Sequence, residues 1–342
     1  MSPFNVKVLT GPTAEKDLVA LLNRTFPVPQ GKSFFDDFPI WEEKYGATLH
    51  RLGAYLGDST KLVSTASARL VNLKSPVPGK SGVPVALIGG VSTDEECRGH
   101  GIASTMVEQL VKWAEEKGAV FAFLWGSEHD MYRRLGFDLA GTQVRMPLAE
   151  TQLPVVTGKL QIQRGWDARL LKVLQRRPYG LEITEKDSKW LAAHKNVEWY
   201  WVPSGDDVAA YAAIGRGIDL PEIIHEWGGD RKTLLELFSA LFSGRPELQI
   251  LGPANLIDDL GFEVLDQQLE FLGLARIFDI ERLVKSYYPK ILDAEMEGLK
   301  QLTGKNLIQA LLGPSAPIPL KTSSTEIAML PIPFWLWGLD GA

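Results

Sequence analysis

The sequence predicts an α/β fold with mixed sheets, built as two tandem copies of one domain and followed by a short C-terminal region. Three observations support this prediction. Apolar strands and amphipathic helices follow one another through the first 150 residues. A glycine-rich loop joins one of these strands to one of these helices. A similar order of elements returns between residues 151 and 280, and the triplet Leu-Gly-Phe occurs in both copies, at Leu135 and at Leu260.

The first copy is predicted over residues 1–150. Its strands are expected, from alternating or wholly apolar patterns, at 4–10, in the two halves of 49–73 around a turn at Gly57 and Asp58, and at 85–93, 119–126 and 137–148. Helices are expected at 13–26, with Thr13 as the N-cap, from Ile102 onward with one apolar face, and at 129–136. Residues 27–39 are expected to form a loop with an aromatic cluster.

The second copy is predicted over residues 151–280. It has a strand, turn and strand at 197–215, an amphipathic helix at 230–242, and a segment at 248–272 that resembles the end of the first copy. Residues 281–342 match neither copy. We expect them to form a helical region and a buried Pro- and Trp-rich tail that ends in "PIPFWLWGLDGA".

Composition excludes several classes of protein. A hydrophobic share of 45% is enough for ordinary cores, and a net charge of -6 argues against a nucleic-acid partner. The single cysteine, Cys97, cannot form an internal disulfide, which suits a reducing cytoplasm. No signal peptide is visible and no apolar run approaches the ~20 residues that span a bilayer, so we expect a cytoplasmic protein without a membrane partner. Five scattered histidines and one cysteine offer no zinc spacing, so no metal is expected.

The stretch "ECRGHGIAS" (96–104) predicts an anion-binding loop. A P-loop would need Gly-Lys-Ser/Thr at its end, but Ile102 and Ala103 follow Gly101. A dinucleotide fingerprint would need a third glycine where Ser104 stands and an acid about 20 residues later. Bare backbone at two glycines lets N–H groups converge on an anion, and the start of the following helix faces the same place. A purely structural strand-to-helix turn is the alternative.

The loop matches the pyrophosphate loop of the GNAT acetyltransferases, whose pattern is Arg/Gln-x-x-Gly-x-Gly/Ala, at Arg98, Gly101 and Ala103. Together with "WGSEHDMYRRLGF" in the expected order, it makes the chain resemble GNAT N-acetyltransferases of the tandem-domain type, typified by the enhanced intracellular survival protein. The resemblance is specific over residues 1–150, moderate over 151–280 and poor afterwards. That type usually ends in a sterol-carrier-like domain, for which too little chain remains here, so residues 281–342 would be a reduced version of it.

The resemblance implies acetyl-CoA as cosubstrate and assigns residues to it. The strand end at Val91, Ser92 and Thr93 would pair with the pantetheine arm, and one of its N–H groups would polarise the thioester carbonyl. The pyrophosphate would lie on the loop and helix start that follow, with Arg98 adding a charge; the loop residues are Gly99, His100, Gly101, Ile102, Ala103 and Ser104. Ser127 and Glu128 would line the sulfur end of the slot.

The resemblance also implies catalytic roles. Tyr132 would protonate the departing thiolate, with a core aromatic as the alternative; its ordinary pKa of about 10 keeps it protonated at neutral pH. The residues do not single out one general base. Glu128, His129 and Asp130 are near in sequence, although acids before a helix are more often caps. The C-terminal carboxylate of Ala342 is another candidate for the base. The alternative is that the tail only fills the core and has no catalytic role.

Two functions follow. The first is an acetyl-CoA-dependent N-acetyltransferase acting on a small-molecule or peptide amine, with a homo-oligomer left as an option. The second is a non-catalytic acyl-CoA-binding or scaffold protein. Cys97 is interpreted as packing, and the aromatic cluster Phe34, Phe35, Phe38 and Trp41 either walls the acceptor pocket or belongs to the core.

The second copy is predicted to be degenerate. Aligning the Leu-Gly-Phe triplets places Ile257 opposite Tyr132, and Asp230 stands where the phosphate-binding helix begins. A carboxylate there caps the helix and repels a phosphate. One acetyl-CoA per chain is therefore expected.

Overall fold

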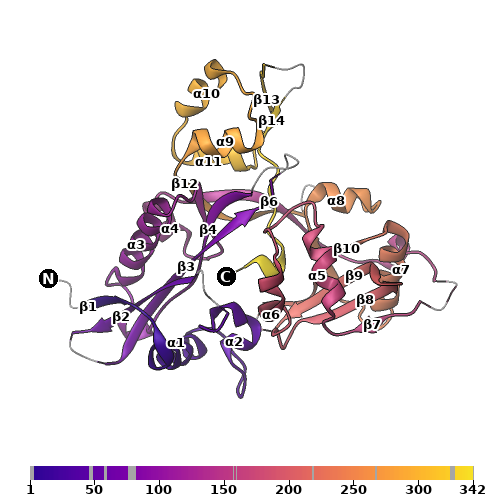
Figure 1. The fold of residues 1–342 in the computed structure, drawn as a ribbon, viewed down its shortest axis with the longest axis horizontal. Helices are drawn as coiled ribbons and strands as arrows, with labels where there is room; N and C mark the ends of the chain where they lie inside the picture. The colour runs from indigo at the N-terminus through magenta and orange to yellow at the C-terminus, as the bar shows by residue number, and fades with distance from the viewer. Residues whose placement is uncertain are drawn as a thin grey trace.

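The computed structural model describes residues 4–45, 49–57, 60–75, 82–156, 158, 160–217, 219–265, 268–323 and 328–341. In these residues both copies share one mixed sheet of 12 strands (Figure 1). In spatial order the strands are β1 (Phe4–Val8), β2 (Leu49–Leu56), β3 (Leu62–Leu73), β4 (Val83–Thr93), β5 (Phe121–Leu124), β12 (Leu269–Ile277), β6 (Asp138–Pro147), β11 (Gln249–Gly252), β10 (Asp219–Gly229), β9 (Asp207–Arg216), β8 (Glu198–Ser204) and β7 (Gln163–Arg164).

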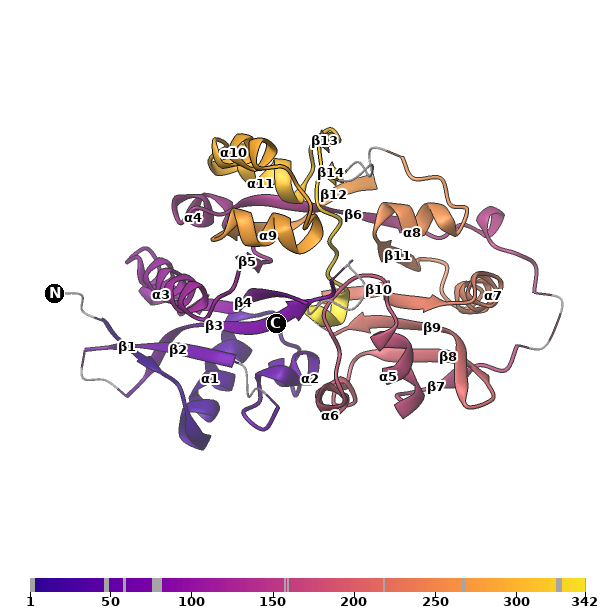
Figure 2. The ribbon, with the colours of Figure 1, turned by 45° about the horizontal axis from the view of Figure 1, so that its top comes forward.

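The two copies exchange their last strands. Strand β12 of the second copy pairs antiparallel with β5, from Leu274 opposite Leu124 to Ile277 opposite Phe121. Strand β6 of the first copy pairs with β11 instead, and β6 and β12 pair with each other at the centre of the sheet. The spatial units are therefore a first lobe, β1–β5 with β12, and a second lobe, β6–β11. Each lobe is completed by a strand from the other copy, so the sheet runs unbroken between them (Figure 2).

Helices cover both faces of the sheet. Along β4, Val85 and Leu87 belong to one core and Ala86 and Ile88 to the other, because neighbouring side chains of a strand point to opposite faces. The helices of the two copies are α1 (Gly11–Thr25), α2 (Phe34–Asp37), α3 (Ile102–Glu116), α4 (His129–Arg134), α5 (Ala168–Gln175), α6 (Ser188–Leu191), α7 (Arg231–Phe242) and α8 (Ala254–Asp259). Helix α1 contributes to the first core and α3 to the second.

Local details differ from the sequence predictions at the first helix and in the loop after it. Helix α1 begins at Gly11 with Thr10 as N-cap, so the prediction of a cap at Thr13 is wrong; Pro12 lies in the first turn, where its fixed φ suits a helix start. Within the predicted loop at 27–39, Ser33 and Asp36 form a capping box that starts α2. In the turn predicted at Gly57 and Asp58, Asp58 lies outside the described residues.

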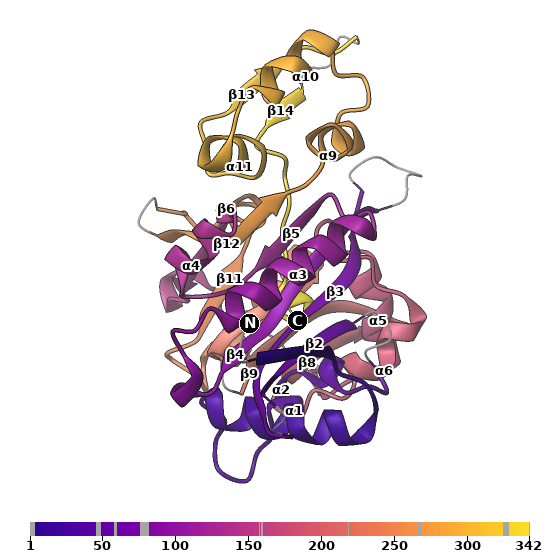
Figure 3. The same cartoon turned by 90° about the vertical axis from the view of Figure 1, so that its left-hand side faces the viewer.

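The C-terminal region leaves the sheet and then returns to it. Three helices and a two-stranded hairpin stand at one end of the molecule (Figure 3); they are α9 (Ile280–Tyr287), α10 (Asp293–Lys300), α11 (Gly304–Leu312), β13 (Ile318–Leu320) and β14 (Ala328–Leu330). The remaining tail, residues 331–341, runs back between the two lobes. Its Trp335 and Trp337 are each only 1% exposed.

A buried ionic cluster fixes this tail. The guanidinium of Arg177 donates from Nη1 to both carboxylate oxygens of Glu226, each at 2.9 Å. Its Nη2 donates to Asp340 at 2.8 Å. All three side chains are at most 2% exposed. Burial lowers the pKa of Arg177, but the carboxylates of Asp340 and Glu226 outweigh it and raise that pKa. Burial raises the pKa of Glu226, against the opposing effect of Arg177.

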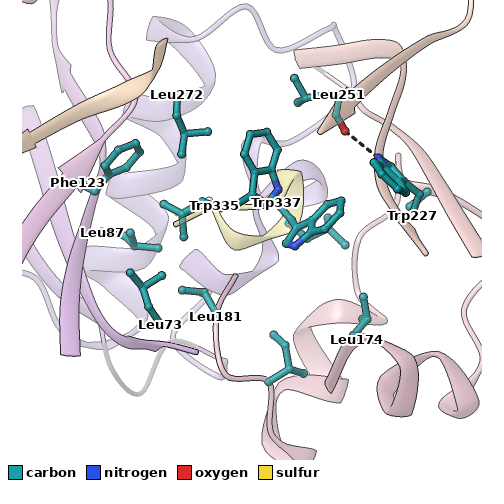
Figure 4. Packing of buried hydrophobic residues seen from close by; sticks show 14 of the residues in the cluster. Leu73, Leu87, Phe123, Leu174, Leu181, Trp227, Leu251, Leu272, Trp335 and Trp337 are labelled. Carbon is teal, nitrogen blue, oxygen red and sulfur yellow. Dashed lines mark hydrogen bonds between the residues drawn. The ribbon is translucent and has the colours of Figure 1, made fainter. Parts of the chain in front are cut away.

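Backbone groups complete the cluster. The second carboxylate oxygen of Asp340 accepts from the N–H groups of Trp337 and Leu181, and Glu226 accepts from the N–H of Leu339. Figure 4 shows Trp335 and Trp337 between side chains of both lobes. Both the charged and the apolar side chains of the tail therefore have buried partners, and these contacts fix its position.

Contacts outside the tail also join the lobes. Lys74, directly after β3, donates to the carbonyls of Gln175, the last residue of α5, and of Arg177. Burial and the charge of Arg177 lower the pKa of Lys74 to about 8. Within the described ranges, the structure contains no helix of the length and apolar character needed to cross a membrane.

Replacing Asp340 by alanine should lower the free energy of unfolding by about 3–5 kcal/mol, because Arg177 would remain buried beside an incomplete set of partners. Urea denaturation measures this change. The matched control is Arg176→Gln, which breaks the exposed pair of Arg176 with Asp207 and should have little measurable effect. Equal losses in the two variants would contradict the central role of the cluster.

Candidate active site

The candidate site begins where β4 and β5 separate. Their parallel pairing ends at Ile88 opposite Leu124, whereas β4 continues to Thr93. On its other side β4 has a bulge, since its register with β3 shifts between Gly89 and Ser92. Gly90 has φ of 56°, and a Cβ there would lie 2.1 Å from the ring of buried Trp41. Glycine at this position therefore permits both the bulge and the close packing of the indole.

The predicted loop directly follows β4. Gly99 and Gly101 have φ of 79° and 75°, the left-handed region that favours glycine, and Gly101 is the N-cap of α3. Among the described residues, the backbone N–H groups of residues 99–104 have no internal acceptor. The loop thus presents unpaired donors at the positive end of a helix of 15 residues, an arrangement suited to an anion.

An ion pair anchors the start of this loop to α1. Arg24 donates to both oxygens of Asp94, at 2.7 and 2.9 Å, and to the carbonyl of Leu62. The bond from Arg24 holds the pKa of Asp94 below its usual value. On the neighbouring strand β3, Ser64 donates from its hydroxyl to the carbonyl of Ser92, at 2.7 Å. The end of β4 is therefore fixed from two sides.

A cavity of about 610 Å³ lies against the loop, and we call it the loop cavity. Most residues that the sequence assigns to a cofactor line it, namely Val91, Ser92, Thr93, Arg98, Gly99, Gly101, Ile102, Ala103, Ser104 and Glu128, and so does Tyr132, the predicted general acid. Thr25, Phe26, Cys97, Met131 and Arg134 complete the lining. Cys97 also packs against the neighbouring core.

Two of the assigned residues lie elsewhere. The ring of His100 is outside the lining: its Nδ1 lies 3.0 Å from the carbonyl oxygen of Arg98, and its edge meets the ring of Phe4. Ser127 lines a different cavity. All other residues that the sequence assigns to the cofactor line the loop cavity.

This second cavity, of about 420 Å³, lies between the lobes, and we call it the central cavity. The first copy contributes Phe26, Phe34, Phe38, Ile88, Gly89, Gly90, Val91, Trp125, Gly126, Ser127, Glu128, Tyr132, Gln143 and Arg145. The second copy contributes Arg216, Asp219, Leu220, Ile223, Leu251 and Leu272, and the tail contributes Leu336, Trp337, Gly338 and Gly341. Phe34 and Phe38 of the aromatic cluster line it, whereas Trp41 is fully buried in the core.

The two cavities meet at Phe26, Val91, Glu128 and Tyr132, which line both. Tyr132 is 5% exposed and lies on α4, with its ring against Gly126, where a Cβ would come within 2.7 Å of it. Burial, with a smaller effect of the Glu128 charge, raises the pKa of Tyr132 to about 12. The phenol is therefore a protonated group at the junction across the neutral pH range.

The central cavity also includes residues that the sequence analysis does not single out, first among them Arg216 on β9. Arg216 donates to the carbonyl of Gly338, forms a pair with Asp219 and lies over the ring of Phe38. Arg145 and Trp125 were missed as well, because an arginine on an alternating strand and a tryptophan after a strand carry no local signal of function. Ala342 lies outside the described residues, but Gly341, which precedes it, lines the central cavity.

The second lobe repeats the extended strand of the site and has a cavity beside the loop that follows it, but a side chain fills the gap between the strands. The pairing of β10 with β11 ends at Ile224 opposite Ile250, and β10 continues to Gly229. Three residues beyond that pair, in the place of Val91, stands Trp227. Its indole Nε1 donates to the carbonyl of Leu251 at 2.9 Å and spans the gap between the strands (Figure 4). A cavity of about 490 Å³ remains beside it, lined by Tyr211, Leu234, Leu256 and Trp337 among others.

Two further residues distinguish this lobe from the first. Asp230 is the N-cap of α7 and accepts from the backbone N–H of Thr233 at 3.0 Å, a bond that holds the pKa of Asp230 below its usual value. Ile257 occupies the position of Tyr132, since each receives a backbone bond from the Leu and the Phe of its Leu-Gly-Phe triplet. The described residues contain no group of three or more His, Cys, Asp or Glu side chains arranged to hold a metal ion.

Comparison with known proteins identifies the first copy. Residues 9–140 match the family model described as "Acetyltransferase (GNAT) domain". The chain therefore contains a GNAT acetyltransferase domain, and this domain holds the loop, β4 and Tyr132. No curated protein matches the chain.

Solved structures share the fold over most of the chain. A probable N-acyltransferase from Enterococcus faecalis has a TM-score of 0.61 at 18% identity, with 84% of this chain and 76% of that chain covered. A GCN5-related N-acetyltransferase from Kribbella flavida has a TM-score of 0.57 at 19% identity, covering 83% and 74%. Eis1 from Mycobacterium abscessus, a tandem-GNAT protein, has a TM-score of 0.51 at 18% identity, covering 83% and 76%. The chain has the tandem-GNAT fold.

Replacing Gly101 by glutamate should abolish binding of acetyl-CoA, because it puts a negative charge at the unpaired N–H groups of the helix start. Calorimetry with acetyl-CoA measures the loss. Gly165→Glu is the matched control: Gly165 also has a positive φ, of 85°, with open space around it, but lies in the second lobe. If Gly101→Glu binds acetyl-CoA like the control, the loop is not the anion site.

Proposed function

We propose that the protein is an acetyl-CoA-dependent N-acetyltransferase that acts on a primary amine. The observation that carries this proposal is the junction of the loop cavity with the central cavity at Val91, Glu128 and Tyr132. One cavity has an anion-binding loop at its far end, and the other is walled by aromatic and apolar side chains. Two substrates that bind in them would meet beside a protonated phenol.

Acetyl-CoA would bind in the loop cavity. Its pyrophosphate would accept from the N–H groups of residues 99–104, with Arg98 adding a positive charge. Its pantetheine arm would lie along β4, where the missing partner strand leaves the edge from Gly89 to Thr93 open. The backbone N–H of Val91 would then donate to the thioester carbonyl and stabilise the oxyanion that forms there.

The chemistry would be a direct attack. The amine nitrogen in the central cavity forms a bond to the thioester carbonyl carbon, giving a tetrahedral intermediate. The nitrogen of this intermediate loses a proton to solvent, and when the C–S bond breaks, Tyr132 donates its proton to the departing thiolate. The acetylated amine and CoA leave, and solvent returns a proton to Tyr132.

A base must first take a proton from the ammonium form of the acceptor. Glu128 is a candidate because it is exposed at the junction and has no side-chain partner among the described residues. The carboxylate of Ala342 is the other candidate, supported by the position of Gly341 in the lining of the central cavity. Burial of Asp340 in the Arg177 cluster would hold that end of the chain near the site.

The second copy would not bind cofactor. We propose residues 1–150 as the catalytic domain, 151–280 as a degenerate GNAT domain, and 281–342 as a reduced sterol-carrier-like region with the tail. Trp227 occupies the gap that pantetheine would use, Asp230 caps the helix that a phosphate would need, and Ile257 has no proton to give. The second lobe would instead provide walls of the central cavity and hold the tail.

Tyr132→Phe should lower kcat about 10²–10⁴-fold with near-normal affinity for acetyl-CoA, because it removes only the general acid. Release of CoA with a panel of amines, read by mass detection, measures this. Because the pKa of Tyr132 is raised to about 12, the wild-type rate should not fall between pH 7 and pH 10 on its account. An unchanged rate in the variant would remove Tyr132 from the mechanism, whereas binding of acetyl-CoA by the wild type without turnover of any amine would favour a non-catalytic acyl-CoA-binding protein.

Calorimetry of the full chain with acetyl-CoA should give one cofactor per chain. The single site should disappear in Gly101→Glu, whereas Asp230→Asn should leave the stoichiometry unchanged, since Trp227 still spans the second gap. Two binding events in the wild type, or a residual event in Gly101→Glu, would show that the second lobe binds cofactor.

A further inference from the structure

The charged side chains of the central cavity indicate what the acceptor carries besides its amine. Four charged residues line this cavity, namely Glu128, Arg145, Arg216 and Asp219. Arg216 and Asp219 neutralise each other through two bonds, at 2.9 and 2.6 Å. Arg216 also donates to the Gly338 carbonyl and lies over Phe38, so this pair is part of the wall.

The two remaining charges have no opposite partner. Glu128 is exposed and has no side-chain bond among the described residues. Arg145 donates from Nε to the side chain of Gln249 at 2.8 Å, and the two terminal nitrogens of its guanidinium have no partner within the described ranges. A planar guanidinium with both terminal nitrogens free matches a carboxylate in a two-bond arrangement.

Only one of these two charges lies at the junction of the cavities. Glu128 lines both cavities and so lies at the junction where the amine would react, whereas Arg145 lines the central cavity alone. Arg145 is on β6, opposite Leu251 in the register with β11, and its bond to Gln249 holds it toward the second lobe. An acceptor in this cavity therefore meets a negative charge at its reacting end and a positive charge away from it.

Aromatic side chains form much of the wall around them, namely Phe26, Phe34, Phe38, Trp125 and Trp337. A cavity of about 420 Å³ with such walls suits a ring or another flat apolar group. It suits a polycation poorly beyond the junction, because the unpaired charge there, that of Arg145, is positive.

We infer that the acceptor is a primary amine with an apolar, ring-bearing body and a carboxylate, the carboxylate bound by Arg145. This inference rests on the proposed function and adds the substrate class. Glu128 attracts the ammonium end, the aromatic wall holds the body, and Arg145 orients the molecule so that its amine faces the acetyl group.

Three primary amines of one shape test the charge preference, with the full chain and acetyl-CoA as reagents and mass detection of the acetylated product. They are 4-(aminomethyl)benzoate, benzylamine and 1,4-bis(aminomethyl)benzene, which carry a carboxylate, no second charge and a second ammonium. We expect the carboxylate compound to have the highest kcat/KM and the diamine the lowest. Equal values for the three, or a preference for the diamine, would overturn the inference.

Variants assign the preference to its residue. Arg145→Gln should lower kcat/KM for the carboxylate compound about 10- to 100-fold, the range expected for a lost bond to a charged group, and leave benzylamine unchanged. Arg145→Glu should reverse the order in favour of the diamine. Arg176→Gln, an exposed arginine outside the central cavity, is the matched control and should change none of the three values. A loss in Arg145→Gln that is equal for all three amines would mean a structural role and would contradict the inference.

Binding separates this inference from the proposed function. Calorimetry of the carboxylate compound and of benzylamine, with CoA present, should show tighter binding of the carboxylate compound in the wild type and no difference in Arg145→Gln. If that holds but no amine is acetylated, the substrate class stands and the catalytic proposal fails. If the two compounds bind alike in the wild type, the inference fails whatever the rates.

Discussion

The position of the C-terminal tail depends on the buried contact of Arg177 with Glu226 and Asp340. The three side chains come from the loop after α5, from β10 and from the tail, and each is closed off from solvent. A buried charge without its partners is costly, so the cluster favours the position of the tail in which all three side chains are paired. When it forms, Trp337 and Gly338 come to lie in the wall of the central cavity. The shape of that cavity is therefore coupled to an ionic contact that does not touch a substrate.

The two lobes share a fold but differ at the gap between the strands and at the start of the next helix. In both lobes a long strand continues beyond its parallel neighbour and leaves a gap before the next helix. In the first lobe glycines keep the gap and the loop open, and the helix start has unpaired N–H groups. In the second lobe an indole spans the gap and a carboxylate caps the helix. The difference lies in a few side chains, Trp227 and Asp230 above all, and in the connection to the helix, which spans residues 94–101 in the first lobe and is Asp230 alone in the second.

Sequence patterns predicted the parts of the site that one stretch of chain contains. The loop at 98–104, the end of β4 and the helix with Tyr132 each have a local signal, in glycine spacing, alternation or a short motif. The central cavity could not be predicted in this way. Trp125, Arg145 and Arg216 are far apart in the chain and are ordinary residues in their own segments, and they meet only because β6 and β12 exchange lobes and the tail returns between them.

By itself, the sequence determined the two related copies, the order of their elements, the open loop of the first copy and the capped helix of the second. These properties are local, because a φ value, a helix cap or an apolar period depends on residues within a few positions. The tertiary structure alone decided that the copies exchange strands, that Asp340 joins Arg177 and Glu226, and that the wall of the central cavity is drawn from both copies and the tail. Those outcomes depend on which distant surfaces bury each other, and strand register and ion pairing over more than a hundred residues have no signature in any one segment.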